Sequence, residues 1–292
     1  MNDLIGVGLG ILSGLLDATK NALFRYSKNK VDPLTFGLYG VFIATLIMLP
    51  ILLFHGIVIL NVNFWYSLIA VTFLDGISSL MYIKAIQISG LSNTVPLITI
   101  TPIFIVIIEF FILGDIPSKL GFLGIFLIVI GAYLLNFKKK NKNYLEPFKS
   151  LMNDKGSKTM LIVSFLFAVV AILYKTGINA SDEITFFSFA VFSIFIFYFF
   201  IALFKIDWKT FVKARKYFKI FFFTSIIGTI GSLLTTFVMK IIYVSYAISL
   251  KRLSVLFSVL IGFLIFKEKN FKEKIIGSII MVIGVLIIGL YG

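Results

Sequence analysis

The stretch LFRYSKNKVDPLTF, residues 23–36, returns 150 residues later as LYKTGINASDEITF, residues 173–186. Asp32 of the first copy aligns with Asp182 of the second, and both copies end on a Thr-Phe pair. Farther along the chain the match continues at an offset of 153 residues. The sequence therefore predicts a fold in which one structural unit occurs twice.

A polar, lysine-rich insert at residues 138–158 separates the two copies. We expect a first five-helix repeat over residues 1–140, a basic linker over 141–158 and a second five-helix repeat over 159–292. A second basic stretch, residues 205–219, carries apolar residues near helical spacing. That pattern predicts either a short helix in the membrane interface or a solvated loop.

Apolar residues dominate the chain, because 60% of residues are hydrophobic and only 14% are charged, against roughly 25% charged in soluble domains. Apolar stretches of about 20 residues, the length that crosses a bilayer as a helix, recur throughout. The first lacks the basic start and cleavage site of a signal peptide, so we expect it to be a span. The ten predicted spans are residues 4–25, 34–54, 65–88, 91–113, 118–137, 159–178, 183–204, 218–240, 243–266 and 272–291.

Each half contains five predicted spans, and an odd number forces the second half to enter the membrane upside down relative to the first. The predicted fold is an all-α integral membrane protein with ten transmembrane helices, arranged as two five-helix inverted-topology repeats. Many secondary transporters have this architecture, because two similar halves can open a central site to either side of the membrane.

Lysine and arginine concentrate in the predicted loops after spans one, five, seven and nine. By the positive-inside rule these loops are cytoplasmic, which places both termini outside the cytoplasm in a multi-pass protein of the cell membrane. The same placement accounts for the net charge of +14 without a nucleic-acid partner.

Several chemistries lack their usual residues here. The chain has no cysteine and one histidine, His55, which leaves neither a thiolate site nor a paired-imidazole site for a metal. It also lacks a P-loop, an HExxH zinc motif and a GxSxG nucleophile motif. We therefore expect no enzyme activity, no cofactor and no metal. The expected partners are the lipid bilayer and a small-molecule metabolite, and the expected assembly is a monomer or homodimer.

The chain resembles the EamA-type branch of the drug/metabolite transporter superfamily over its whole length. The matching residues include Ala85, Pro102 and the acidic residues Asp115 and Glu268, which follow the fourth and ninth spans. The chain departs from the family where Asp115 replaces a usual Glu and where Val255 stands opposite Pro102. The resemblance implies an exporter or exchanger of small metabolites with a central cavity and does not fix the substrate.

Many family members keep both termini in the cytoplasm, so the resemblance and the lysine distribution disagree on orientation. The aligned glycine pairs also match the family: Gly124 with Gly131, and Gly277 with Gly284.

Ionisable side chains inside a span cost roughly 2.5–3.5 kcal/mol each, so they are expected to face a partner or a wet cavity. In the first span, Ser13, Asp17 and Lys20 follow the i, i+4, i+7 spacing of one helical face. Asp17 and Lys20 either neutralise each other or face the cavity together. Lys84 and Glu109, near the ends of the third and fourth spans, are expected to extend toward the membrane surface.

In the third span, Asp75, Ser79 and Tyr82 form a second polar stripe. Asp75 is a candidate carrier of a coupling proton, and pairing with Lys20 or Arg252 is the structural alternative. The equivalent stripe of the second half shares the polarity but not the charge: Gly228, Ser232 and Thr235.

The ninth span contains two cations, Lys251 and Arg252, inside the apolar run SYAISLKRLSVLF. Arg252 shares a helical face with Ser245 and Ser249, whereas Lys251 points about 100° away. We therefore expect only Arg252 to point fully into the cavity, where its guanidinium suits a carboxylate or a phosphate. The alternative is a salt bridge with a carboxylate of the chain itself: Asp17, Asp75 or Glu109.

The fourth span aligns with the ninth and places Thr99 at the position of Arg252, with Asn93 nearby. Pro96 and Pro102 are expected to kink this span and free carbonyl groups beside the cavity. Glycine stripes are expected to let helices pack closely in lipid: Gly6, Gly10 and Gly14, together with the aligned pairs above.

The predicted function is secondary active transport, as an exporter, of a small polar metabolite such as an amino acid, by alternating access around a mid-membrane cavity. Arg252, with Lys20, would bind an anionic group, while Asp17 or Asp75 would bind an amino group or a coupling proton. The alternatives are exchange of phosphorylated metabolites or nucleotide sugars, export of cationic drugs, and a non-transporting scaffold or flippase-like partner subunit. The predicted substrate-binding residues are Asp17, Lys20, Asp75, Tyr82, Asn93, Thr99, Tyr246, Ser249 and Arg252.

Overall fold

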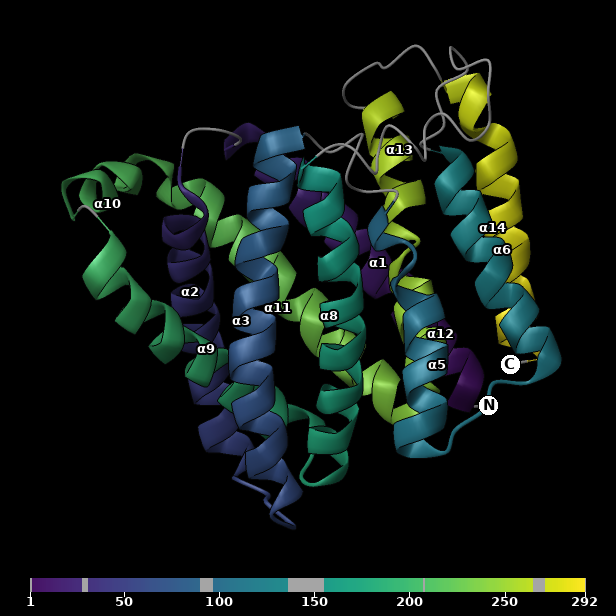
Figure 1. Cartoon of the computed structure of the whole chain (residues 1–292), viewed down its shortest axis with the longest axis horizontal. Helices are drawn as coiled ribbons and strands as arrows, with labels where there is room; N and C mark the ends of the chain where they lie inside the picture. Colours follow the sequence, from purple (N-terminus) through teal and green to yellow (C-terminus); the bar gives the residue numbers. More distant parts are fainter. Residues whose placement is uncertain are drawn as a thin grey trace.

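The computed structural model describes residues 2–27, 31–89, 97–135, 155–206, 208–264 and 271–291, and every regular element in these ranges is a helix (Figure 1). The elements are α1 (Asn2–Ser27), α2 (Pro33–His55), α3 (Asn63–Ser89), α5 (Thr101–Leu113), α6 (Lys119–Leu135), α8 (Lys155–Asn179), α9 (Glu183–Lys205), α10 (Trp208–Ala214), the 3₁₀ turn η1 (Arg215–Tyr217), α11 (Phe218–Ile241), α12 (Val244–Lys251), α13 (Ser254–Leu264) and α14 (Phe271–Tyr291).

The helices form ten spans that run alternately up and down, with α5 in span four and with α12 and α13 together in span nine. This confirms the prediction of an all-α membrane protein built from two five-helix inverted repeats. Both ends of the described chain lie at one end of the bundle, here called the termini side (Figure 1). Four connections lie on that side: 56–62, 114–118, 180–182 and 242–243.

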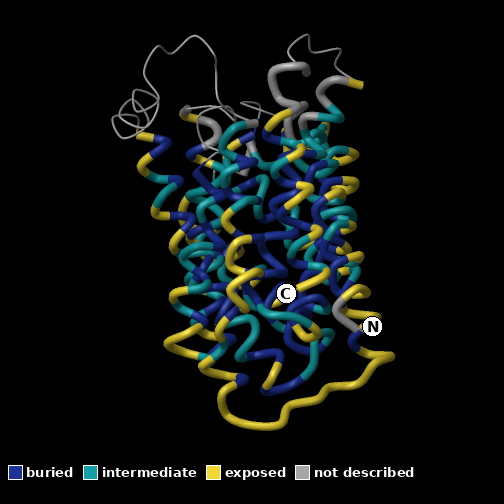
Figure 2. The backbone as a smooth tube through the Cα atoms, turned by 90° about the vertical axis from the view of Figure 1, so that its right-hand side faces the viewer, coloured by how far each residue is buried: buried dark blue, intermediate teal, exposed yellow. Residues whose placement is uncertain are grey.

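Outward-facing residues of the bundle are largely apolar, as a lipid-facing surface requires. Phe204 is 87% exposed and Phe111 is 78% exposed, and Figure 2 shows exposed stretches along the outside of helices whose inner parts are buried. Five of the described helices are long and apolar enough to cross a membrane by length and composition.

The repeated aspartates cap equivalent helices. Asp32 accepts a hydrogen bond of 2.9 Å from the amide of Thr35 at the start of α2. Asp182 accepts one of the same length from Thr185 at the start of α9. Each carboxylate satisfies an amide that has no partner inside the helix. The opening repeat of the sequence is therefore a helix start that occurs twice.

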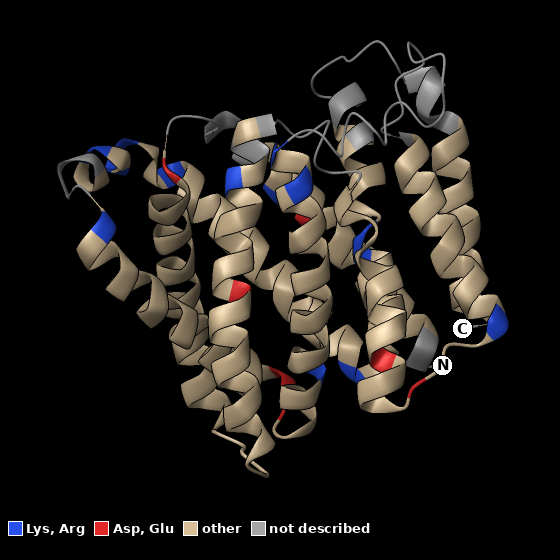
Figure 3. Cartoon of the chain, in the orientation of Figure 1, with Lys and Arg blue, Asp and Glu red and all other residues tan. Residues whose placement is uncertain are grey.

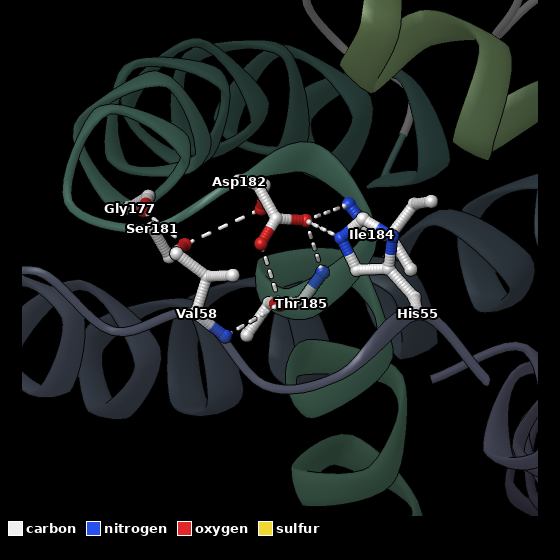
Figure 4. Close-up of polar contacts among 7 residues, drawn as sticks. All are labelled: His55, Val58, Gly177, Ser181, Asp182, Ile184 and Thr185. Atoms are coloured by element: carbon white, nitrogen blue, oxygen red, sulfur yellow. Dashed lines mark hydrogen bonds and ion pairs between the residues drawn. The ribbon is translucent and has the colours of Figure 1, made fainter. Parts of the chain in front are cut away.

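Asp182 also joins the two halves on the termini side (Figure 4). Its Oδ1 lies 3.1 Å from Nε2 of His55, which ends α2. Close by, the amide of Val58 donates to the hydroxyl of Thr185 at 3.3 Å. The connection between α2 and α3 is thus bound to the turn between α8 and α9.

Spans four and nine both depart from α-helical geometry at the same point of the repeat. In span four a turn at Thr99 and Ile100 precedes α5, and in span nine a turn at Arg252 and Leu253 separates α12 from α13. The offset between the two turns is 153 residues, the offset of the sequence repeat. The mid-membrane break is therefore a property of the repeated unit.

The two turns share their hydrogen bonding. Ile100 donates to the carbonyl of Leu97 at 3.3 Å, and Leu253 donates to that of Leu250 at 3.0 Å. These are i to i+3 bonds, which leave nearby groups of the helical ladder free. In span four, Pro102 follows the turn and has no amide to donate, so the predicted distortion is observed there, although span nine turns at the same point with Val255 in the aligned position. Pro96 lies outside the described residues, and the break in span nine was not predicted from the sequence.

The glycine stripes pack helices as predicted. A Cβ atom on Gly124 of α6 would lie 2.8 Å from the carbonyl oxygen of Gly284 on α14, and one on Gly284 would lie 2.7 Å from that of Gly124. Similarly, a Cβ on Gly14 of α1 would lie 3.1 Å from the carbonyl oxygen of Leu250. The first span therefore packs directly against the broken part of span nine.

The basic stretch 205–219 contains the short helix α10 followed by η1, so of the two expectations the helix is observed. Phe211 stacks on Tyr39 of α2 with ring centroids 4.6 Å apart, and Ala214 is buried, so this face of α10 packs on the bundle. Of the predicted linker 141–158, residues 141–154 lie outside the described residues and the remainder begins α8.

Among the described residues, lysine and arginine gather mainly at the end of the bundle opposite the termini side (Figure 3). This agrees with the predicted alternation of loops. The assignment of that end to the cytoplasm stays a prediction.

Candidate functional site

A cavity of about 420 Å³ lies in the middle of the bundle, between the two repeats. Its walls come from α1, α2, α3 and α5 of the first half and from α8, α9, α11 and α12 of the second. Spans one to four of the first half and spans six to nine of the second half therefore all contribute to the wall. The volume suits a small metabolite, because ligand pockets span roughly 300–1,000 Å³.

Both polar stripes predicted on spans three and eight face this cavity. Asp75, Ser79 and Tyr82 line it from α3. Their repeat partners line it from α11: Gly228, Ser232 and Thr235. The two helices are thus related by the repeat and present equivalent faces to one central space, one charged and the other neutral.

Asp17 and Lys20 line the cavity from α1 and form an ion pair, with Nζ of Lys20 2.6 Å from Oδ1 of Asp17. Asn21 donates to the other carboxylate oxygen at 3.4 Å. The two alternatives expected for this pair are both observed, since the two side chains form an ion pair and also line the cavity.

Lys251 and Arg252 both line the cavity. The expectation that only one of the two would do so is wrong, because a long side chain can reach the cavity from a position about 100° away on the helix. The backbone is still helical here, since the amide of Arg252 donates to the carbonyl of Ile248 at 3.1 Å.

Neither cation has a hydrogen bond or ion pair from its side chain within the described part of the chain. Arg252 is only 8% exposed, and its Nε is buried without a partner. A buried guanidinium nitrogen without an acceptor is unfavourable, because it has lost its hydration without a replacement. Arg252 therefore presents unused donors at the cavity wall.

The three carboxylates that could have paired with Arg252 are engaged elsewhere. Asp17 pairs with Lys20, and Asp75 accepts a hydrogen bond of 3.1 Å from Ser79. Glu109 is fully buried and accepts hydrogen bonds from backbone amides of α12. The expectation that Glu109 extends to the membrane surface is wrong, because α12 starts directly beside it.

The ionisable groups of the cavity wall leave a positive balance. The wall carries three cations and two carboxylates, a sum of +1 when all are ionised. Asp17 and Lys20 cancel locally, so the excess lies at Lys251 and Arg252. The helix dipole offsets part of this charge, because both residues lie at the C-terminal end of α12.

Several predicted site residues lie away from the cavity. Ser249 is buried and donates to the carbonyl of Ser245 within α12. Tyr246 is 2% exposed, and its hydroxyl accepts a hydrogen bond of 3.2 Å from the amide of Ser118. Thr99 is buried and is not among the lining residues. Asn93 lies outside the described residues. Helical hydrogen bonding continues to Arg252, whose amide donates to Ile248, so the predicted stripe exists, but only Arg252 of its residues reaches the cavity.

Other residues line the cavity that the sequence analysis did not select. Tyr198 of α9 lines it and donates to the carbonyl of Gly76 at 2.7 Å, and Tyr174 of α8 adjoins the carboxyl of Asp75. A helical signal was present in span eight, where three further hydroxyl residues join the predicted Ser232 in an i, i+4, i+7, i+11 spacing: Ser225, Thr229 and Thr236.

The termini side of the cavity is filled by apolar packing. Ile248 and Met239 line the cavity and also belong to a cluster of buried residues that includes Val244 and Ile105. Members of this cluster lie near the termini-side ends of α3, α5, α8, α9, α11 and α12. Polar lining residues such as Asn21 and Thr224 lie toward the other end of the bundle.

Comparisons with known proteins agree with this architecture. The model of the EamA-like transporter family matches the chain twice, at residues 4–137 and 154–290. A solved structure titled only "Crystal structure of protein" has a TM-score of 0.68 and 14% sequence identity, and the match covers 97% of this chain and 95% of that chain. At that identity the likeness shows a shared fold. No curated protein matches the chain.

Proposed function

This chain belongs to the EamA-like transporter family, and from that membership we propose that it is a secondary active transporter of a small organic anion. In this proposal the substrate binds in the central cavity and crosses the membrane by alternating access. The lipid bilayer is its environment, and transport needs no cofactor.

The observation that carries the proposal is a pair of cations on the cavity wall, Lys251 and Arg252, whose side chains have no hydrogen bond or ion pair with any described residue. An ion at membrane depth is unfavourable unless a partner compensates it. A substrate anion in the cavity would supply that partner and would satisfy the free donors of Arg252. Arginine suits this role because its planar fork donates two parallel hydrogen bonds to a carboxylate or a phosphate.

The charge balance favours a phosphorylated metabolite as the anion. Two adjacent cations match the two charges of a phosphate monoester better than the single charge of a carboxylate, and Lys20 lies on the same wall. A zwitterionic amino acid is the second candidate, and one observation favours it. Asp75 lines the cavity without an ion-pair partner in the described residues, so it could meet an ammonium group.

Alternating access is supported by the two halves and by the closed termini side. Inverted repeats provide two related arrangements that differ in which half is packed at which side. The buried cluster around Val244 and Ile105 closes the termini side here, so the opposite arrangement would open it. Breaks at Thr99 and Arg252 give spans four and nine a place to bend.

Asp75 is the residue that we propose for a coupling proton. Neutralising its carboxyl would raise the charge of the cavity wall from +1 to +2, which then matches a dianion. Binding of a proton and of a phosphate monoester would thus favour each other, which is the thermodynamic basis of cotransport.

Counterflow in proteoliposomes tests the proposal. Vesicles loaded with unlabelled inorganic phosphate, a small phosphate monoester or a neutral amino acid are diluted into the same compound in radiolabelled form. We expect accumulation of the phosphate monoester, with inorganic phosphate as a competitor. Accumulation of the amino acid alone would favour the second candidate, and no accumulation of any anion would contradict the proposal.

A further inference from the structure

The connection between α11 and α12 is bound at both ends by charged side chains from other helices. This connection, residues 239–245, is called the α11–α12 corner below. On its α12 side, Oε1 of Glu109 lies 2.6 Å from the amide nitrogen of Val244 and Oε2 lies 3.1 Å from that of Ser245. Glu109 belongs to α5, so a residue of the first half binds the start of a helix in the second half.

Glu109 caps the N-terminus of α12, which has no capping side chain of its own. The residue at its N-terminal boundary, Tyr243, makes no side-chain capping bond. The first amides of a helix have no partner inside the helix, and a carboxylate there also interacts favourably with the helix dipole. Glu109 is 0% exposed, so these hydrogen bonds compensate for its own lost hydration.

On the α11 side of the corner, Nζ of Lys175 donates to the carbonyl oxygen of Met239. Met239 lies in the last turn of α11, where carbonyl groups lack partners and a cation is favourable. Lys175 belongs to α8 and is partly buried. A negative charge therefore binds the start of one helix and a positive charge binds the end of the preceding one.

The corner lies on the termini side and closes the cavity there. Val244 and Met239, at its two ends, belong to the buried apolar cluster between the cavity and that side. Ile248, one turn farther along α12, lines the cavity. Any arrangement that opens the cavity toward the termini side must move this corner away from α5 and α8.

The repeat does not supply a second carboxylate at the position equivalent to Glu109, because Gly262 stands 153 residues later. At this position the two halves are therefore asymmetric, and the carboxylate of Glu109 acts on the termini side alone. This asymmetry biases the two arrangements, since only differential contacts shift such an equilibrium.

We propose that Glu109 and Lys175 hold the termini-side gate closed by binding the two ends of the α11–α12 corner. Opening requires that the carboxylate of Glu109 leave the amides of α12. The inference rests on the proposed alternating access. It adds the gate residues, which lie outside the cavity wall and do not touch the substrate.

The absence of cysteine from the chain allows a direct test with one introduced thiol. Ile248→Cys places the thiol on the cavity wall behind the corner. A membrane-impermeant maleimide is added to the termini side of oriented vesicles without substrate. We expect Glu109→Gln to raise the labelling rate by about tenfold, the factor that corresponds to about 1.4 kcal/mol and to one lost charge-assisted hydrogen bond.

Asp32→Asn is the matched control, because it removes a helix-capping carboxylate at the opposite end of the bundle, away from the corner. Its labelling rate should equal that of the parent. Lys175→Met should raise the rate in the same direction as Glu109→Gln. Equal rates in all four proteins, with melting temperatures that show folded variants, would overturn the proposal.

Two further measurements keep the test decisive. If Glu109→Gln does not fold, Glu109→Asp retains the charge on a shorter side chain, and an intermediate rise in labelling supports the proposal while an unchanged rate contradicts it. Labelling needs no substrate, so it tests the role of the gate residues independently of which substrate the protein transports. If Glu109→Gln is labelled faster but the protein transports no anion, the gate stands and only the proposed function is contradicted.

Discussion

Nζ of Lys20 lies 2.6 Å from Oδ1 of Asp17, one helical turn away on the cavity wall. The two opposite charges of this pair cancel within the first span, and this affects the partners available to Arg252 in span nine. Because Asp17 is already paired, Arg252 has no carboxylate of the chain as a partner within the described residues. The positive character of the cavity is therefore concentrated at the break in span nine.

Removal of the Asp17 carboxylate should destabilise the protein by leaving Lys20 without a counter-ion. We expect Asp17→Asn to lower the free energy of unfolding by about 1–2 kcal/mol, less than for a fully buried pair because Lys20 is 35% exposed. The double variant Asp17→Asn/Lys20→Gln should recover most of the loss, measured by unfolding in detergent micelles. Additive losses in the double variant would show that the pair contributes nothing.

Asp75 should couple transport to protons. We expect Asp75→Asn to retain counterflow but to lose the dependence of net uptake on an imposed pH gradient, because an amide cannot exchange a proton. Asp115→Asn is the control, since Asp115 does not line the cavity. Unchanged gradient-driven uptake by Asp75→Asn would assign the coupling elsewhere.

The close packing of α6 and α14 should tolerate no side chain at Gly124. A Cβ there would lie 2.8 Å from a backbone oxygen of Gly284, which cannot move aside without separating the helices. We expect Gly124→Ala to lower stability by about 1–3 kcal/mol. Gly8→Ala is the matched control, because nothing lies within 4 Å of its Cβ position, and the higher helix propensity of alanine should leave stability equal or slightly raised. Equal melting of both variants would contradict the packing account.

The fold could be predicted because its signals are local. Apolar runs long enough to cross a bilayer defined the spans, and the repeat of Asp32 at Asp182 defined the two halves. The helix caps then appeared where the repeat placed them. The glycine stripes were also readable, since small residues at one face predict close helix contact whatever the partner helix is.

The site was only partly predictable, because it depends on where helices break and which ends meet. No proline or glycine marks the turn at Arg252, so the break was not predicted. Lys251 was assigned away from the cavity from its helical angle alone, and Ser249 and Tyr246 were included as site residues although their hydroxyls bond within the protein. Glu109 was misplaced for a related reason. A carboxylate near a span end resembles one that reaches the surface, and only the position of α12 shows that it caps a helix.

The affinity for a phosphate monoester, measured by calorimetry on the purified protein, tests the central claim most directly. We expect Arg252→Gln and Lys251→Gln each to weaken binding by at least about tenfold, because each removes one charge-assisted contact. Lys84→Gln, an exposed cation outside the cavity, should bind as the parent does. Loss of affinity in the two cavity variants with unchanged melting temperatures is the predicted result. Equal affinity in all four proteins would contradict the assignment of Lys251 and Arg252 to the substrate anion.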